Sequence, residues 1–313
     1  MKKSVLVIAL AFGVTGAFAQ DLTSKKGEPM LPEAEDWAIS MNADPIFYFV
    51  GNAFNANTDN DAPGVNWLNG NQTIIGKKFI DDKNAYRALV RLGYTNETYK
   101  NMVADNSAVP PTTATFDAPA MVEDKFKMKN TNIGIGVGKE MRRGKTRLQG
   151  YYGADAMIWI SMTSTKYEYG NTMTGAPTAA TQTSTPTSTQ WDPNTGAQTG
   201  PAIADGDREI SSKSGMTFGL GVRGFIGAEY FIFPKMAIGA EYGWGIGYQM
   251  SGKGKSTNEY TQMIGATNTT GETETVTSGS SKFGFDTDLN QGTIFGFRGS
   301  NTGTASLRVT FHF

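Results

Sequence analysis

The sequence Thr304–Phe313 reads TASLRVTFHF. Its side chains alternate strictly between apolar and polar. One face of an extended strand would carry Ala305, Leu307, Val309, Phe311 and Phe313, and the other face Thr304, Ser306, Arg308, Thr310 and His312. Because successive side chains of a β-strand point to opposite sides, this segment is predicted to be a strand with one apolar face and one polar face.

The same alternation recurs along the chain and predicts an all-β protein. Residues 86–94 alternate Tyr86, Val90 and Leu92 with Arg87 and Arg91. After residue 19, no apolar run approaches the roughly 18 residues that a membrane-spanning helix needs. Eight strands are expected, at approximately Asn42–Val50, Gln72–Asp81, Ala85–Asn96, Thr131–Met141, Thr146–Met162, Gly215–Tyr230, Lys235–Met250 and Thr304–Phe313.

The lengths of the connections alternate between long and short. Three are short, at 82–84, 142–145 and 231–234, and four are long polar loops, at about 51–71, 97–130, 163–214 and 251–303. Outer-membrane barrels have an even number of strands, short periplasmic turns and longer extracellular loops. The order predicts a membrane-spanning antiparallel up-and-down β-barrel of eight strands, or alternatively ten, with both termini in the periplasm.

Charge distinguishes the two faces of the predicted strands. An Arg or Lys that faces lipid at the middle of a bilayer costs about 2 to 4 kcal/mol, so the charged face is expected to line the interior. Side chains just fill an eight-stranded barrel, so these charges are expected to pair as a structural plug. A charged conduit, which needs ten or more strands, and a catalytic cluster are the alternatives. The predicted interior network comprises Arg87, Arg91, Glu140, Arg147, Asp155, Arg223, Glu229, Glu241 and Arg308.

The N-terminal region predicts export from the cytoplasm. Lys2 and Lys3 precede an apolar stretch of about ten residues, and Ala17-Phe18-Ala19 forms a small-x-small cleavage site before Gln20. Residues 1–19 are therefore expected to be a signal peptide, cleaved between Ala19 and Gln20. Residues 20–41 are expected to be a periplasmic tail, either a disordered leader or a docking segment, and 42–313 the barrel.

The layout resembles that of the small outer-membrane β-barrels of Gram-negative bacteria. The signal ending Ala17-Phe18-Ala19, the alternating strands, the sorted connections and the terminal Phe311-His312-Phe313 are similar to the OmpA-transmembrane and OmpX-type families. The resemblance covers roughly residues 42–313 and is one of architecture, so it identifies no subfamily. It implies that Phe311 and Phe313 supply the aromatic C-terminal signal read by the barrel assembly machinery during insertion.

No motif in the sequence predicts a catalytic, cofactor or metal site. The chain has no cysteine, and its one histidine, His312, is expected inside the barrel at the periplasmic rim. Gly219–Gly224 matches GxGxxG, but it falls inside a predicted strand rather than between a strand and a helix. Acidic segments around Asp59 and Asp286 offer spaced oxygen ligands for Ca²⁺ but lack the glycine and closing glutamate of an EF-hand, so solvated loops are favoured.

These observations favour a non-enzymatic role in the bacterial envelope. We expect an outer-membrane protein in contact with lipid that acts as a structural or interaction component, possibly within a larger assembly joined through its loops or N-terminal tail. A small-solute pore with a charged lumen is the first alternative, and an outer-membrane hydrolase or lipid-modifying enzyme is the second. A net charge of −1 gives no basis for nucleic-acid binding.

Overall fold

The computed structural model describes residues 22–43, 73–107, 120–173, 188–202, 207–264, 267–287 and 306–313. These residues form fourteen β-strands joined by turns, which confirms the predicted all-β class. The described part of the chain has no helix of the length and apolar character that crossing a membrane requires.

Eight of the strands pair antiparallel into a closed ring. The ring closes because β14 pairs on one side with β10, where Ile238 lies opposite Val309, and on the other with β1, where Ile39 lies opposite Phe311. In ring order the strands are β1 (Trp37–Asn42), β2 (Ile74–Phe79), β3 (Asn84–Ala104), β4 (Met121–Arg143), β5 (Leu148–Glu168), β9 (Thr217–Phe233), β10 (Met236–Ser251) and β14 (Ser306–His312).

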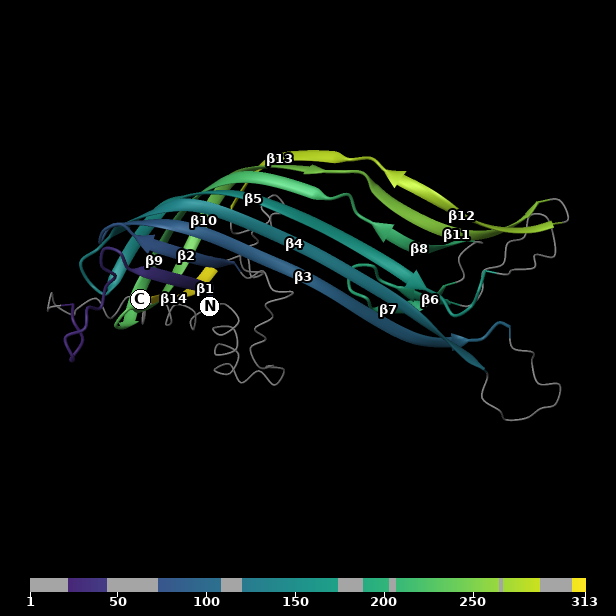
Figure 1. Ribbon diagram of the computed structural model, residues 1–313, viewed down its shortest axis with the longest axis horizontal. Coiled ribbons are helices and arrows are strands. Elements are labelled where there is room, and N and C mark those ends of the chain that lie inside the picture. Colours follow the sequence, from purple (N-terminus) through teal and green to yellow (C-terminus); the bar gives the residue numbers. More distant parts are fainter. Residues whose placement is uncertain are drawn as a thin grey trace, which may run out of the picture.

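The long strands β3, β4 and β5 continue well beyond the ring, as Figure 1 shows. There they join β8 (Asp207–Lys213), β11 (Gly254–Ile264) and β12 (Thr267–Thr277), and we call this part of the sheet the extension. β13 (Ser280–Thr287) pairs with residues Trp244 to Ser251 of β10, the part farther from the short connections. A separate hairpin of β6 (Ser188–Trp191) and β7 (Gln198–Ala202) lies beside the extension (Figure 1).

The short connections gather at one end of the ring, which we call the turn end. They are residues 80–83, 144–147 and 234–235. In the first of them, Asp81 Oδ1 accepts hydrogen bonds from the backbone amides of Lys83 and Asn84, both at 2.7 Å, which fixes a tight turn. Lys235 occupies the left-handed region with a φ of 56°, which lets the last turn close in two residues.

Seven of the eight predicted strands match ring strands to within a few residues at the turn end. The first does not: Asn42–Val50 lies mostly outside the described residues, and the strand found here is Trp37–Asn42. Three of the predicted long loops are wrong in part, because they contain strands: β3 and β4 extend into 97–130, 163–214 includes the end of β5 with β6, β7 and β8, and 251–303 includes β11, β12 and β13. The loop at 51–71 lies outside the described residues.

The N-terminal segment from Leu22 to Asp36 folds against the turn end of the ring. Met30 is buried against Phe231 and Ala237. Lys235 Nζ lies 2.7 Å from Asp36 Oδ2, and Phe79 exchanges backbone hydrogen bonds with Glu35 and Asp36. The disordered-leader alternative is therefore wrong for these residues, which dock on the turns.

Candidate functional site

The candidate site is the interior of the ring, which every long ring strand supplies with a charged side chain. The alternation of β3 turns Arg87 and Arg91 inward while Tyr86, Val90 and Leu92 face outward and are exposed. By the same alternation, the other strands bring in Glu140 from β4, Asp155 from β5, Arg223 and Glu229 from β9, Glu241 from β10 and Arg308 from β14.

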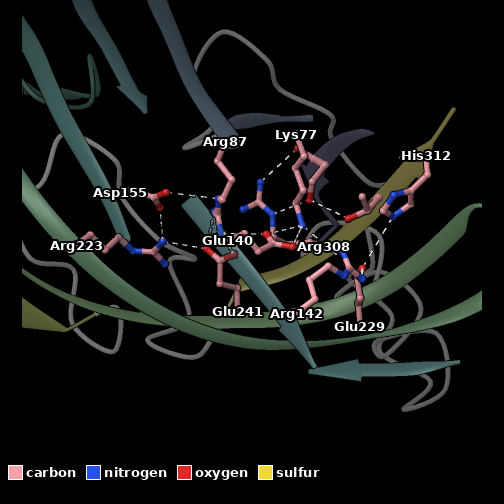
Figure 2. A network of polar contacts seen from close by, with 12 residues as sticks. Lys77, Arg87, Glu140, Arg142, Asp155, Arg223, Glu229, Glu241, Arg308 and His312 are labelled. Carbon is pink, nitrogen blue, oxygen red and sulfur yellow. Dashed lines mark hydrogen bonds and ion pairs between the residues drawn. The ribbon is translucent and has the colours of Figure 1, made fainter. Parts of the chain in front are cut away.

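Arg87 and Glu241 form the centre of the network (Figure 2). Two guanidinium nitrogens of Arg87 donate to the two carboxylate oxygens of Glu241 at 3.0 and 3.2 Å, a bidentate pair. Arg223 also donates to Glu241 at 2.9 Å and to Asp155 at 3.4 Å. The face of the Phe225 ring lies 3.8 Å from the Arg87 guanidinium carbon. Arg87, Glu241 and Asp155 are almost completely buried and Arg223 is 13% exposed, so each charge depends on its partners.

A second group of charges lies nearer the turn end. Lys77 Nζ lies 2.8 Å from a Glu140 oxygen, and Arg142 pairs with both Glu140 and Glu229. His312 Nε2 is 3.9 Å from Glu229, and the His312 ring packs between the side chains of Phe79 and Phe231. Figure 2 shows the two groups joined through Glu140 into one continuous network.

Arg308 is held by neutral groups rather than by a carboxylate. It donates to Ser40 Oγ at 2.9 Å and to the backbone carbonyl oxygens of Ser40 at 3.3 Å and Thr73 at 3.0 Å. Arg91, farther from the turn end, is also buried and lies opposite Gly134 of β4. The buried interior therefore holds more cations than carboxylates among the described residues.

One predicted network residue lies elsewhere, and two residues were missed. Arg147 is exposed in the turn before β5, because the alternation of strand side chains ends at Leu148, so its assignment to the interior was wrong. Arg142 was expected in a turn, although it shares the face of Glu140 on β4. Lys77 could not be assigned because Lys78 follows it; the burial of Ile75 and Phe79 shows that Lys77 faces inward.

Two interior glycines make room for large neighbours. A Cβ on Gly219 would collide with the indole of Trp159, and one on Gly243 would collide with the guanidinium of Arg223. Gly219 belongs to the GxGxxG match, which lies wholly within β9 and so does not form a nucleotide-binding turn.

The interior also contains apolar packing. Ile75, Leu89 and Met157 form a buried cluster inside the ring. Among the residues that the structure describes, no group of three or more His, Cys, Asp or Glu side chains could hold a metal ion. The acidic segment around Asp59 lies outside the described residues. The arrangement is suited to pairing the interior carboxylates with cations.

The outer face of the ring is exposed and mostly apolar. Its charged outward residues include Lys139 of β4, opposite Ala154, and Lys78 of β2, opposite Tyr86. Ile135 is 51% exposed and Val137 is 66% exposed. No outward position is charged from Tyr86 to Tyr94 on β3, from Leu148 to Ile160 on β5 or from Phe218 to Tyr230 on β9. Phe311 and Phe313 are also exposed. We call this surface the apolar band.

In the extension, the polarity of the two faces is reversed. Phe126 and Met128 of β4 face inward and form a buried cluster with Trp191 of β6. Asp124, fully buried, accepts hydrogen bonds from the backbone amides of Gly170 at 2.9 Å and Thr189 at 2.7 Å, which fixes β6 to the sheet. The outward residues of the same stretch include Lys125, Lys127 and Lys129.

Comparison of the chain with protein-family models, with curated proteins and with solved structures found no match. The case for a function therefore depends on the residues and geometry described above.

Proposed function

We propose that this protein is an eight-stranded outer-membrane β-barrel, similar in architecture to the OmpA-transmembrane and OmpX-type families. Its role is that of a non-enzymatic structural or interaction component of the envelope. The observation that carries the proposal is the distribution of polarity in the ring, which is charged inside and mostly apolar outside. Water would penalise that arrangement, whereas lipid favours it.

The size of the apolar band fits a bilayer. At about 3.3 Å per residue, the stretch of β5 from Leu148 to Ile160 is about 40 Å long. At the tilt of about 40° usual for outer-membrane strands, this corresponds to a height of about 30 Å, close to the apolar band of about 25 Å in known barrels. The extension would then stand outside the cell and the turn end would face the periplasm.

The packed interior favours a structural role over conduction. Arg87, Glu140 and Glu241 have side chains that are at most 2% exposed. Each interior carboxylate contacts at least two cations, so these carboxylates are surrounded by ion pairs instead of lining an aqueous path. The extension, with its β6–β7 hairpin, offers a large surface for other envelope proteins, and the docked N-terminal segment offers a smaller one.

The proposal is tested by flotation, electrophoresis, conductance, enzymatic turnover and behaviour without detergent. The mature chain should float with lipid vesicles and migrate differently on electrophoresis before and after heating, as closed membrane barrels do. Planar bilayers containing it should show no steady conductance. Conductance that changes on Arg87→Ala would favour the pore alternative, and turnover of lipid or peptide by purified protein would favour the enzyme alternative. A chain that is compact and monodisperse in buffer without detergent contradicts the membrane assignment.

The interaction role needs a separate experiment. Extraction of the protein from native membranes in mild detergent should yield it in a stoichiometric complex. Recovery of a lone particle would leave the barrel proposal intact but remove the case for a subunit of a larger assembly.

A further inference from the structure

Five lysines gather on the outer face of the extension, next to the apolar band. Strand register places Lys129 of β4 in one row with Lys213 of β8 and Lys255 of β11, through Ser164 of β5. In the next row out, Lys127 lies directly opposite Lys166. We call these the basic rows.

The basic rows run parallel to the last row of the apolar band. That row pairs Leu92 with Ile133, Ile133 with Ile160 and Ile160 with Phe218. Between it and the lysines lies a single outward row in which Tyr94 and Met162 flank Thr131. Four residues separate Ile133 from Lys129, which is about 13 Å along the strand. In a bilayer, the lysines would therefore lie at the level of the lipid headgroups.

The charge on this surface is unbalanced nearest the band. Within the described residues, the five lysines share two carboxylates: Glu168 lies 2.8 Å from Lys127 and 3.1 Å from Lys166, and Glu274 lies 2.8 Å from Lys255. Glu168 belongs to the row beyond the lysines, opposite Lys125. Hydrogen bonds from Lys127 and Lys166 lower the pKa of Glu168 to about 2, as a locally positive surface would.

The exposure of the lysines leaves them available to a ligand. The side chains of Lys166 and Lys255 are 63% and 60% exposed, and Lys129 and Lys213 are also exposed. Ammonium groups at an interface bind phosphate as point charges, and a cluster of four to eight cations beside a membrane typically recognises anionic lipid. A row spread across four adjacent strands suits a layer of headgroups better than one compact ligand.

We propose that the basic rows bind the phosphate groups of lipid headgroups in the outer leaflet of the membrane. The inference rests on the proposed membrane location and adds the chemical class of lipid that the protein recruits. The lysines would hold phosphorylated lipids around the extension and fix the depth of the barrel in the bilayer.

The test uses the mature full chain in nonionic micelles, with a bisphosphorylated glycolipid as the probe. The triple variant Lys129→Gln, Lys213→Gln, Lys255→Gln should bind it at least about tenfold more weakly, given the usual contribution of each interfacial lysine. The matched control is Arg143→Gln, Lys145→Gln, Arg147→Gln. It removes the same charge from exposed residues at the turn end and should change the affinity less than about threefold.

Four outcomes would overturn the inference. The first two are an equal loss of glycolipid binding in the two triple variants and no loss in either variant. The third is equal binding of the dephosphorylated glycolipid. The fourth is displacement of the glycolipid by millimolar inorganic phosphate, which would indicate a site for free phosphate. Vesicle flotation of all three proteins is measured in parallel. If they float but the affinities do not differ, only the basic rows fail; if the wild type does not float, the membrane proposal itself fails.

Discussion

The two halves of β4 have opposite polarity although they form one continuous strand. In the ring, the inward residues are Glu140 and Arg142, and the outward ones include Ile133, Ile135 and Val137, with Lys139 as a charged outward residue nearer the turn end. In the extension, inward residues such as Phe126 are apolar and outward residues are lysines. Pairing with β3 continues without a register shift from Met121 to Met141, so backbone geometry does not cause the change. The surroundings of the strand must therefore differ between its two halves, as they do when a strand leaves a bilayer for water.

The largest expected effect comes from removing a carboxylate of the ring interior. Glu241→Gln would leave the buried Arg87 and Arg223 without their shared partner, and breaking a buried pair costs about 3 to 5 kcal/mol. The free energy of unfolding in lipid vesicles, from denaturant titration, should fall by that amount.

The matched variant for this comparison lies in the extension. Glu274→Gln removes an equal charge from the exposed pair with Lys255 and should cost less than about 1 kcal/mol. Similar losses in the two variants would mean that the interior charges are solvated, which would restore the conduit alternative.

The next largest effect concerns the outer faces. Ile135→Arg should destabilise the folded protein by about 2 kcal/mol in vesicles, because Ile135 lies within the apolar band, one outward row inside its last row. Thr98→Arg, on the exposed outer face of the extension, should change stability by less than about 0.5 kcal/mol. If the two arginine variants have the same free energy of unfolding, a boundary between lipid and water does not explain the difference between the two halves of the strand.

The period of two in the sequence was enough to predict the ring and most of its interior. It placed Arg87, Asp155 and Glu241 on the inward face because a single charge in an otherwise apolar strand decides which face is which. It failed for Arg147, which precedes the first residue of β5. It also failed for Lys77, because the adjacent Lys78 puts a charge on each face of the strand. These failures are local, because alternation defines a face only within the strand.

The extension was missed for a different reason. The segment from Lys125 to Lys129 also alternates, but its outward residues are charged. Because a membrane-spanning strand was expected to have apolar outward residues, the segment was predicted to be a loop. The segment is a strand because it pairs with β3 on one side and β5 on the other, and Phe126 packs against Trp191, with ring centroids 5.9 Å apart. Such a contact between distant segments leaves no local signal, and the hairpin that carries Trp191 lies in a segment of low complexity.

A smaller and more local effect is expected where the hairpin meets the extension. Asp124→Asn removes a buried charged acceptor from the amides of Gly170 and Thr189 and should destabilise the docked β6–β7 hairpin by about 1 to 3 kcal/mol. Hydrogen exchange of the Thr189 amide should accelerate while amides of β9 stay protected. Faster exchange in β9 as well would show that the extension and the ring unfold as one unit.

The smallest effect is a titration on the outer face of the extension. The Glu168 carboxylate accepts hydrogen bonds from Lys127, which has the larger effect, and from Lys166, and together they lower its pKa to about 2. A depressed pKa means that the pairing favours the folded state above the ordinary pKa of glutamate and that this contribution disappears as the pH falls toward 2. Carbon NMR of the carboxyl group should show a midpoint near 2 in wild type and a higher one in Lys127→Gln. Because Glu168 is on the surface, added salt should also raise the midpoint of its titration. If neither salt nor the loss of Lys127 changes the midpoint, the outer face of the extension is not in water, and the contrast with the lipid-facing ring fails.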